Sequence, residues 1–380
     1  MSTSFVRRPP HINGGRRRVL AKTRILVTGC SGIGGLNFVR ALRLAERMAS
    51  CEYFIVGTDY NPYYLLMPEV DVRVRSPRHS DPRFREFVAQ LVKEYSIEFV
   101  HPHPSSEAKV IAGFVDELGV KHYLPKPEEI APDKWTMYLK LGEGNVPTPR
   151  AVEVRAVEDV DRAFEEMGSP LWIRAKSGAG GRLSLKVSTP EEAKLWIRLH
   201  EAQKRARACD FVIQEYMPGR DLAFDSLWFR GELVTSYLRE RLEYPLKHIS
   251  LTGITGTPSV ARIVVDDEAS EVGIRAVKAL SPRPHGFYSV DVKEDRDGKP
   301  RVTEVDGKWH TTAPLWGYAV SKAFGDLRYN IAYLYLELGL KGEAPFEVPR
   351  LNLYPEGLYL IRQLDAGVIL KVGEEVFRVA

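Results

Sequence analysis

Apolar positions in the first third of the chain switch between two spacings. Short apolar runs are typical of buried strands, and apolar residues three or four positions apart are typical of amphipathic helices. The strands are expected at residues 24–28, 53–57 and 97–101, and the helices at residues 36–48, 82–95 and 107–118. Because strand and helix alternate, we predict a doubly wound parallel sheet, an α/β domain over residues 24–132.

The pattern changes after residue 133 to strands that follow one another directly, with fewer helices between them. This order indicates an antiparallel α+β arrangement. We expect helices over residues 190–208, 267–280 and 318–338. The first begins with acids and ends with cations, as the helix dipole prefers. Three short alternating runs in residues 358–379 predict a small β meander, within a C-terminal β extension over residues 346–380.

The composition indicates a globular protein without a membrane span. The 380 residues are 44% hydrophobic and 27% charged, and no run reaches eighteen apolar residues. The net charge is +4, but residues 1–22 hold six cations and no acid, so the remainder carries 48 cations against 50 acids. We predict a flexible basic arm over residues 1–23. We do not expect it to bind nucleic acid, because no aromatic or groove-reading pattern accompanies the charge.

The cysteines Cys30, Cys51 and Cys209 are far apart and form no metal-binding spacing. A disulfide framework or a zinc site is therefore not expected, and a reducing cytoplasm fits best. The sequence does not reveal the oligomeric state, and a homo-oligomer is compatible with it.

Residues 286–308 carry the most specific chemical signal. Asp297-Gly298 predicts a two-residue hairpin turn, which places Asp291 opposite Glu304 and Ser289 opposite Asp306. With the period of two of a strand, three carboxylates then share one face: Asp291, Glu304 and Asp306. Such repulsion needs neutralising, and oxygen ligands without His or Cys suit Mg²⁺, which commonly takes phosphate oxygens as further ligands.

Two further segments are typical of nucleotide binding. Residues 171–187 form a strand, with Arg174 and Lys176 at its end, and then a loop with Gly178, Gly180 and Gly181 whose amides can approach phosphate. Residues 213–221 form a strand and a Pro-Gly turn, and the backbone of such an edge can pair with a nucleotide base. Each signal is weak alone, and their order along one chain strengthens them.

Taken together, Asp133-Lys134, the strand and loop IRAKSGAGG, QEYMPG, and VDV followed by EVD resemble the ATP-grasp superfamily. The resemblance is to carboxylate–amine ligases of the carbamoyl-phosphate-synthetase large-subunit and biotin-carboxylase type, over residues 24–325. It implies a pre-ATP-grasp domain followed by a two-lobed ATP-grasp fold, with a small lobe over residues 133–217 and a large lobe over residues 218–345. It also implies ATP with Mg²⁺ or Mn²⁺, and small-molecule carboxylate and amine substrates.

The resemblance assigns roles residue by residue. The residues expected to bind ATP are Lys134, Arg174, Lys176, Gly178, Gly180, Gly181, Arg182, Gln214, Glu215, Tyr216, Met217 and Asp221. Arg174 and Lys308 are expected to be catalytic, and Asp291, Glu304 and Asp306 to hold the metal. The family's usual Glu-x-Asn-Pro-Arg is here Glu-Val-Asp-Gly-Lys, so Asp306 replaces an amide and Lys308 an arginine. A lysine cannot grip phosphate bidentately, which puts the substrate type in question.

Substrate contacts are expected at two further places. The turn over residues 29–35 could bind a substrate anion at the start of the following helix. Near substrate oxygens we place Arg239, Arg241 and His310 beside Lys308, and Trp309 and Trp316 are candidates to line the pocket.

Two alternatives stay open. The glycines of residues 29–35, Asp59 as a ribose acid and Tyr318 with Lys322 together resemble an NAD(P)-dependent short-chain dehydrogenase or epimerase, although about 290 residues separate the turn from the Tyr-Lys pair. The substitutions at Asp306 and Lys308 also fit a degenerate ATP-binding protein without catalysis.

Overall fold

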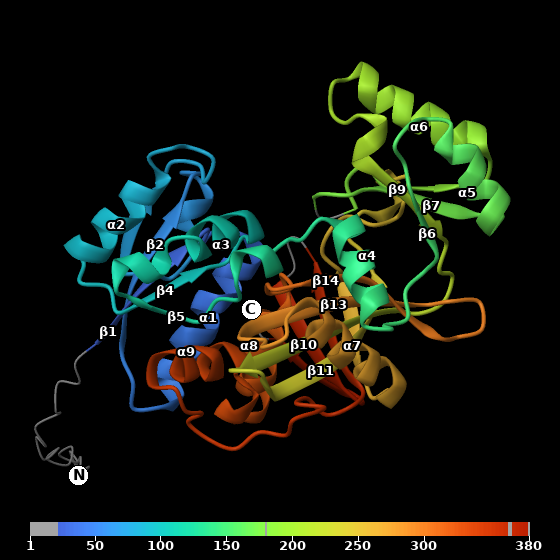
Figure 1. Cartoon of the computed structure of the whole chain (residues 1–380). Coiled ribbons are helices and arrows are strands. Elements are labelled where there is room, and N and C mark those ends of the chain that lie inside the picture. The colour runs from blue at the N-terminus through green and yellow to red at the C-terminus, as the bar shows by residue number, and fades with distance from the viewer. Residues whose placement is uncertain (1–21, 179–180, 364–366, 379–380) are drawn as a thin grey trace, which may run out of the picture.

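The computed structural model describes residues 22–178, 181–363 and 367–378, which form three sheets and the helices around them (Figure 1). The predicted basic arm, except for Lys22 and Thr23, and Gly180 lie outside the described residues.

The N-terminal sheet is parallel, as predicted, with the strand order β3-β2-β1-β4-β5. Its strands are β1 (Thr23–Thr28), β2 (Tyr53–Asp59), β3 (Val72–Arg75), β4 (Phe99–Pro102) and β5 (Lys121–His122). Successive residues of β1 face opposite sides: Ile25 and Val27 pack with helix α1 (Ile33–Met48), whereas Leu26 packs with the other two helices. These are α2 (Phe84–Glu94) and α3 (Ser105–Ala112). Both faces are therefore covered, as a parallel sheet requires.

The small lobe is a four-stranded antiparallel sheet in the order β6-β9-β7-β8. It comprises β6 (Ala151–Glu153), α5 (Asp159–Met167), β7 (Leu171–Ala175), β8 (Leu185–Val187), α6 (Pro190–Ala202) and β9 (Phe211–Glu215). Helix α6 begins where Thr189 Oγ1 accepts a hydrogen bond from Glu192 N. It ends earlier than the predicted residue 208, since Lys204 adopts a positive φ of 55° that a helix cannot continue.

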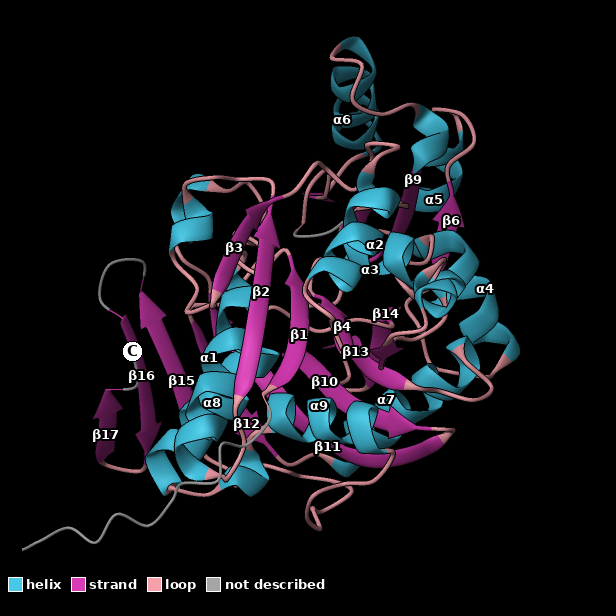
Figure 2. Cartoon of the chain, turned by 90° about the vertical axis from the view of Figure 1, so that its left-hand side faces the viewer, coloured by secondary structure: helices cyan, strands magenta, loops and turns pink. Residues whose placement is uncertain are grey.

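The large sheet is antiparallel, in the order β14-β13-β10-β11-β12-β15-β16-β17. Its strands are β10 (Asp221–Phe229), β11 (Glu232–Glu243), β12 (Val260–Val264), β13 (Gly286–Glu294), β14 (Pro300–Asp306), β15 (Leu358–Gln363), β16 (Gly367–Val372) and β17 (Glu375–Arg378). Helices α4 (Lys134–Glu143) and α7 (Asp267–Leu280) cover one face at the β13–β14 end. The predicted C-terminal meander is confirmed, and it extends this same sheet through pairing of β15 with β12 (Figure 2).

The prediction of one continuous helix over residues 318–338 is wrong. Two helices occupy the region, α8 (Ala313–Phe324) and α9 (Ile331–Lys341), because Gly325 takes the left-handed conformation (φ 66°) and ends the first. Both helices pack against α1 and so join the N-terminal domain to the large sheet. Among the described residues, no helix is both long and apolar enough to cross a bilayer.

Candidate functional site

A cavity of about 630 Å³ lies where the N-terminal domain, the small lobe and the large sheet meet. Most of the predicted site residues line it, together with residues that the sequence did not single out. The predicted residues on its wall are Lys134, Arg174, Gly178, Gly181, Arg182, Gln214, Glu215, Tyr216, Met217, Asp221, Arg241, Asp291, Glu304, Asp306, Lys308 and His310. The structure thus brings segments more than 150 residues apart into one site.

The hairpin of β13 and β14 supplies the cavity floor, with Asp291 opposite Glu304 and Ser289 opposite Asp306, as predicted. The predicted two-residue turn is wrong. Strand β13 ends at Glu294 and β14 begins at Pro300. Between them, Gly298 (φ 74°) is the last residue of a turn that is closed by a hydrogen bond of 3.2 Å from Gly298 N to Asp295 O. This longer loop shifts the register by one residue, and a bulge at Thr303 shifts it back.

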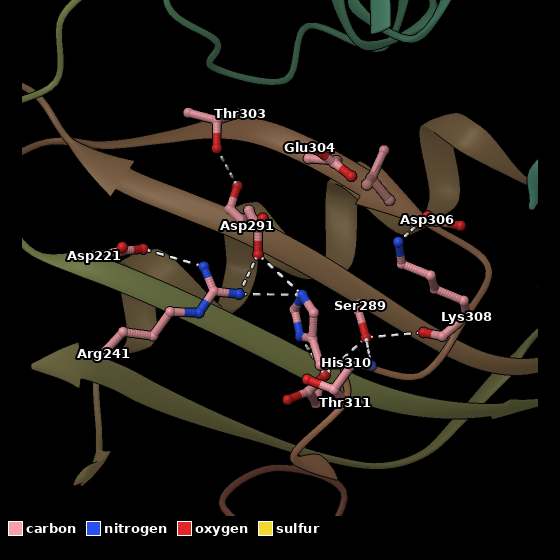
Figure 3. A network of polar contacts seen from close by, with 12 residues as sticks. Asp221, Arg241, Ser289, Asp291, Thr303, Glu304, Asp306, Lys308, His310 and Thr311 are labelled. Atoms are coloured by element: carbon pink, nitrogen blue, oxygen red, sulfur yellow. Dashed lines mark hydrogen bonds and ion pairs between the residues drawn. The ribbon is translucent and has the colours of Figure 1, made fainter. Parts of the chain in front are cut away.

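The facing carboxylates of Asp291 and Glu304 each meet cations through one oxygen. Asp291 Oδ1 contacts Arg241 and lies 2.9 Å from His310 Nε2 (Figure 3). Glu304 Oε2 lies 2.7 Å from Arg174 Nη2 and 3.6 Å from Lys134 Nζ. Burial raises the pKa of both carboxyls, but the neighbouring cations outweigh it and hold each pKa below its usual value. Both groups are therefore ionised at neutral pH.

The third predicted metal ligand, Asp306, is 2% exposed and has partners on both oxygens. Oδ1 accepts a hydrogen bond from Ala131 N at 2.7 Å, and Oδ2 lies 2.8 Å from Lys308 Nζ. Within the described ranges, no group of three or more His, Cys, Asp or Glu side chains is placed to hold a metal ion. The expected three-carboxylate cluster is thus not assembled.

Cations that face the floor come from two other elements. Asp133 caps helix α4 by accepting hydrogen bonds from Trp135 N and Thr136 N, and Lys134 follows it. Lys134 Nζ donates to Gly178 O at 2.8 Å, which ties the glycine loop to this helix. Arg174, on β7, donates to Thr303 O at 3.1 Å and to Glu304.

Lys176 does not line the cavity, contrary to the prediction. Its ammonium lies 2.7 Å from Glu153 Oε1. Strand β7 ends at Ala175, so the alternation that would place Lys176 on the same side as Arg174 no longer applies.

The predicted hinge for a nucleotide base lies on β9 and the residues that follow it. Gln214 Oε1 accepts a hydrogen bond from Tyr138, and Glu215 pairs with Arg150. The Tyr216 ring lies 6.4 Å from the Trp172 ring, which provides two aromatic surfaces at this end of the cavity. Asp221, predicted as a ribose acid, has three donors around its carboxylate, which are Arg241, Tyr244 and Lys293.

Arg239 is not a cavity residue, which corrects its expected role near substrate. It is 1% exposed, and its Nε donates to Asp225 Oδ2 at 3.1 Å beneath the floor. Asp225 Oδ1 in turn lies 2.8 Å from His310 Nδ1. Burial lowers the pKa of His310, but the charges of Asp225 and Asp291 outweigh it and raise that pKa, so His310 is held between two carboxylates.

The N-terminal domain closes the other end of the cavity with its glycine turn and with the residues after β4. Gly29, Gly32 and Gly34 line the cavity, and a side chain at Gly35 would stand 2.4 Å from Gly29 O. Trp309 also lines it, stacked on Phe287 at 3.8 Å. Trp316 is fully buried and is not on the cavity wall.

Cavity residues that the sequence analysis does not name individually include His103, Ser105, Tyr244, Thr257 and Thr311. His103 and Ser105 follow a parallel strand, and ligands commonly bind at the carboxyl ends of such strands. That rule could have found these two residues. The others lie in loops of the large sheet, where no local sequence signal marks them.

No protein-family model matches the chain. It is 26% identical over 217 residues to the glutamate–LysW ligase ArgX of Sulfurisphaera tokodaii, covering 56% of this chain and 73% of that protein. An L-amino acid ligase of Bacillus licheniformis superposes with a TM-score of 0.62 at 17% identity, covering 89% and 79% of the two chains. The biotin carboxylase domain of a Hydrogenobacter thermophilus 2-oxoglutarate carboxylase, in complex with MgADP, ADP and bicarbonate, superposes with a TM-score of 0.65 at 16% identity. The superposition covers 89% of this chain and 73% of that domain.

The chain has the ATP-grasp fold, and the predicted resemblance to carboxylate–amine ligases of that superfamily is confirmed. The dehydrogenase alternative gains no support from these relatives. Tyr318 and Lys322 lie on α8 with their polar atoms 3.4 Å apart, and neither is on the wall of the cavity that the glycine turn lines.

Proposed function

We propose that this protein is an ATP-dependent, ADP-forming ligase that activates a carboxylate as an acyl phosphate and joins it to an amine or ammonia. One observation carries the proposal. An aromatic hinge, two cations, a glycine loop and a pair of facing carboxylates, which are the groups that a nucleoside triphosphate with its metal ion would need, all line one cavity.

The nucleotide site follows from these groups. The base would lie beside the Trp172 and Tyr216 rings, against the backbone of Glu215 to Met217, and the phosphates would extend toward Lys134 and Arg174. These cations are already oriented, Lys134 by Gly178 O and Arg174 by Thr303 O, so little reorganisation is needed when phosphate binds. Catalysis of phosphoryl transfer depends largely on such positioning and charge.

A divalent cation, Mg²⁺ or Mn²⁺, fits the floor through two carboxylates. The ion pairs with the surrounding cations are made through Asp291 Oδ1 and Glu304 Oε2, and the cation would be held by Asp291 Oδ2 and Glu304 Oε1. Two ionised oxygens facing a phosphate site are the ligands Mg²⁺ prefers, with phosphate oxygens completing the set. When bound, the ion would neutralise charge on the phosphates.

The reaction then needs an acid and an amine at the N-terminal end of the cavity. An oxygen of the substrate carboxylate attacks the γ-phosphorus and ADP leaves. The amine attacks the acyl carbon, releases phosphate and loses a proton. Because water would hydrolyse the acyl phosphate, the glycine loop and the loop with Thr252 and Ile254, which also lines the cavity, would have to exclude it. The names of two relatives, glutamate–LysW ligase and L-amino acid ligase, make amino acids the first substrates to screen.

The test is ADP release from ATP and Mg²⁺ across panels of carboxylates and amines. Glu304→Gln should lower turnover by at least about a hundredfold with the circular dichroism spectrum unchanged, because it removes a cation ligand and the partner of Arg174.

The matched control is Glu294→Gln, the same substitution on β13 at a residue paired with Arg220 and outside the cavity. This variant should keep the wild-type rate. Equal rates for wild type and Glu304→Gln would reject the assignment of the site.

A further inference from the structure

The short segment Asp306–Lys308 begins at the last residue of β14 and differs from the pattern of the resembled family at two positions, Asp306 and Lys308. In the structure these two residues contact each other, since Lys308 Nζ lies 2.8 Å from Asp306 Oδ2 (Figure 3). The two departures are therefore one feature, a charge pair in which an acid and a lysine appear together.

The segment is fixed to the linker that joins the N-terminal domain to helix α4. Asp306 Oδ1 accepts from Ala131 N at 2.7 Å, and Gly307 N donates to Glu129 O at 2.8 Å. The approach is close, because a side chain at Gly307 would stand 2.9 Å from that Glu129 oxygen. Turning Asp306 toward a cation would break the hydrogen bond that its Oδ1 accepts from Ala131 N.

Asp291 and Glu304 differ from Asp306 in this respect. The ion pairs of Asp291 converge on Oδ1 and those of Glu304 on Oε2, whereas Asp306 has a different partner at each of its two oxygens. Lys308 lines the cavity together with this carboxylate pair and Trp309.

We propose that Asp306 is a positioning residue that fixes Lys308 at the terminal-phosphate end of the cavity, and that Asp291 and Glu304 alone supply the carboxylate ligands of the divalent cation. This inference rests on the proposed nucleotide site. An asparagine at position 306 would keep the hydrogen bond from Ala131 N but would leave the partly buried ammonium of Lys308 without its ion pair. The pair thus supplies one directed positive charge where the related sequences have an arginine.

The experiment measures binding, so it needs no knowledge of the substrates. Electron paramagnetic resonance gives the affinity for Mn²⁺ in the presence of a non-hydrolysable ATP analogue, and calorimetry gives the affinities for that analogue and for ADP. The variants are Asp306→Asn, Lys308→Met and their double mutant, compared with Asp291→Asn and Glu304→Gln. Glu129→Gln is the control. Glu129 lies in the same linker, its side chain accepts a hydrogen bond from the Tyr288 hydroxyl, and it is not on the cavity wall.

Asp291→Asn and Glu304→Gln should weaken Mn²⁺ binding by at least about tenfold, and Asp306→Asn should leave it near the wild-type value. Asp306→Asn and Lys308→Met should both reduce the preference for the ATP analogue over ADP by about tenfold, and the double mutant should lose no more than Lys308→Met alone. Glu129→Gln should change neither quantity. A purely structural role for Asp306 would lower stability without changing this preference.

The inference is overturned if Asp306→Asn weakens Mn²⁺ binding as Glu304→Gln does, or if the two losses in the double mutant add. Should Asp306→Asn fail to fold, anomalous scattering from Mn²⁺ in crystals of the wild-type complex decides the question, since a metal bound to Asp306 contradicts it and a metal on Asp291 and Glu304 supports it. A wild-type protein that binds no nucleotide would instead refute the proposed function itself.

Discussion

Glu107, on helix α3 beneath the glycine turn, is a carboxyl that the proposed chemistry does not use. It is 5% exposed, and the charge of Asp59 lies nearby. Burial raises the pKa of Glu107 to about 7, against the lowering effect of the Thr28 hydroxyl and with a smaller raising effect from the charge of Asp59. A carboxyl whose pKa rises on folding favours the folded state while it is protonated. That stabilisation is complete below the unfolded pKa and is lost as pH rises through about 7.

We therefore expect the free energy of unfolding to fall by about 3 kcal/mol between pH 4.5 and 8 through this residue alone. Glu107→Gln should remove that part of the pH dependence and stabilise the protein at pH 8. Urea unfolding at both pH values measures the free energy of unfolding of each variant. Glu117→Gln is the control, because Glu117 is exposed on the same domain. An unchanged pH dependence in Glu107→Gln would contradict the argument.

Single residues could be predicted from sequence where charge and strand period act together, as at Asp291 and Glu304. Arg239 and Arg241 show the limit. They lie two apart on β11, so the period gives them one face, yet Arg239 is buried beside Asp225 while Arg241 lines the cavity. The difference depends on which end of that face is covered by distant parts of the chain, and nothing local in the sequence encodes it.

At the scale of elements, the hairpin on the cavity floor was predicted correctly for a partly wrong reason. The loop after β13 is longer than a two-residue turn, and the bulge at Thr303 compensates for it. Bulges have no strong sequence signal, so only the end result, Asp291 opposite Glu304, could be anticipated. The break between α8 and α9 was missed, although Gly325 marks it.

The glycine loop yields a prediction of its own. Gly178 has a φ of +104°, which strains any residue with a side chain, and its carbonyl accepts from Lys134 Nζ. Gly178→Ala should cost about 1 kcal/mol of stability and weaken binding of an ATP analogue several-fold by calorimetry. Gly357→Ala, at a φ of +83° with open space around it, should cost similar stability and leave binding intact. Equal affinities in the two variants would place the loop away from the phosphates.

At the scale of the whole molecule, the domains suggested by sequence differ in how they are held. The N-terminal domain and the large sheet share one hydrophobic core, because α1 packs against α8 and α9. A buried hydrogen bond from Asn330 Nδ2 to Ala41 O, 2.8 Å long, joins them as well. The small lobe has a core of its own, made only of residues between Val152 and Ile213. The change of pattern near residue 132 predicts a boundary there, but it does not indicate that the core crosses it.

This difference predicts how fragments behave. Residues 147–217 keep their whole core and should unfold cooperatively as a small, marginally stable domain. Residues 22–132 should not, because cutting away α8 and α9 exposes apolar side chains of α1, including Phe38 and Leu42, at a cost of about 2 kcal/mol each. Thermal melts followed by circular dichroism, with amide spectra by NMR, distinguish the two. A dispersed spectrum and a cooperative melt from residues 22–132 would show that the shared core is not required, and would make the N-terminal domain an independent unit.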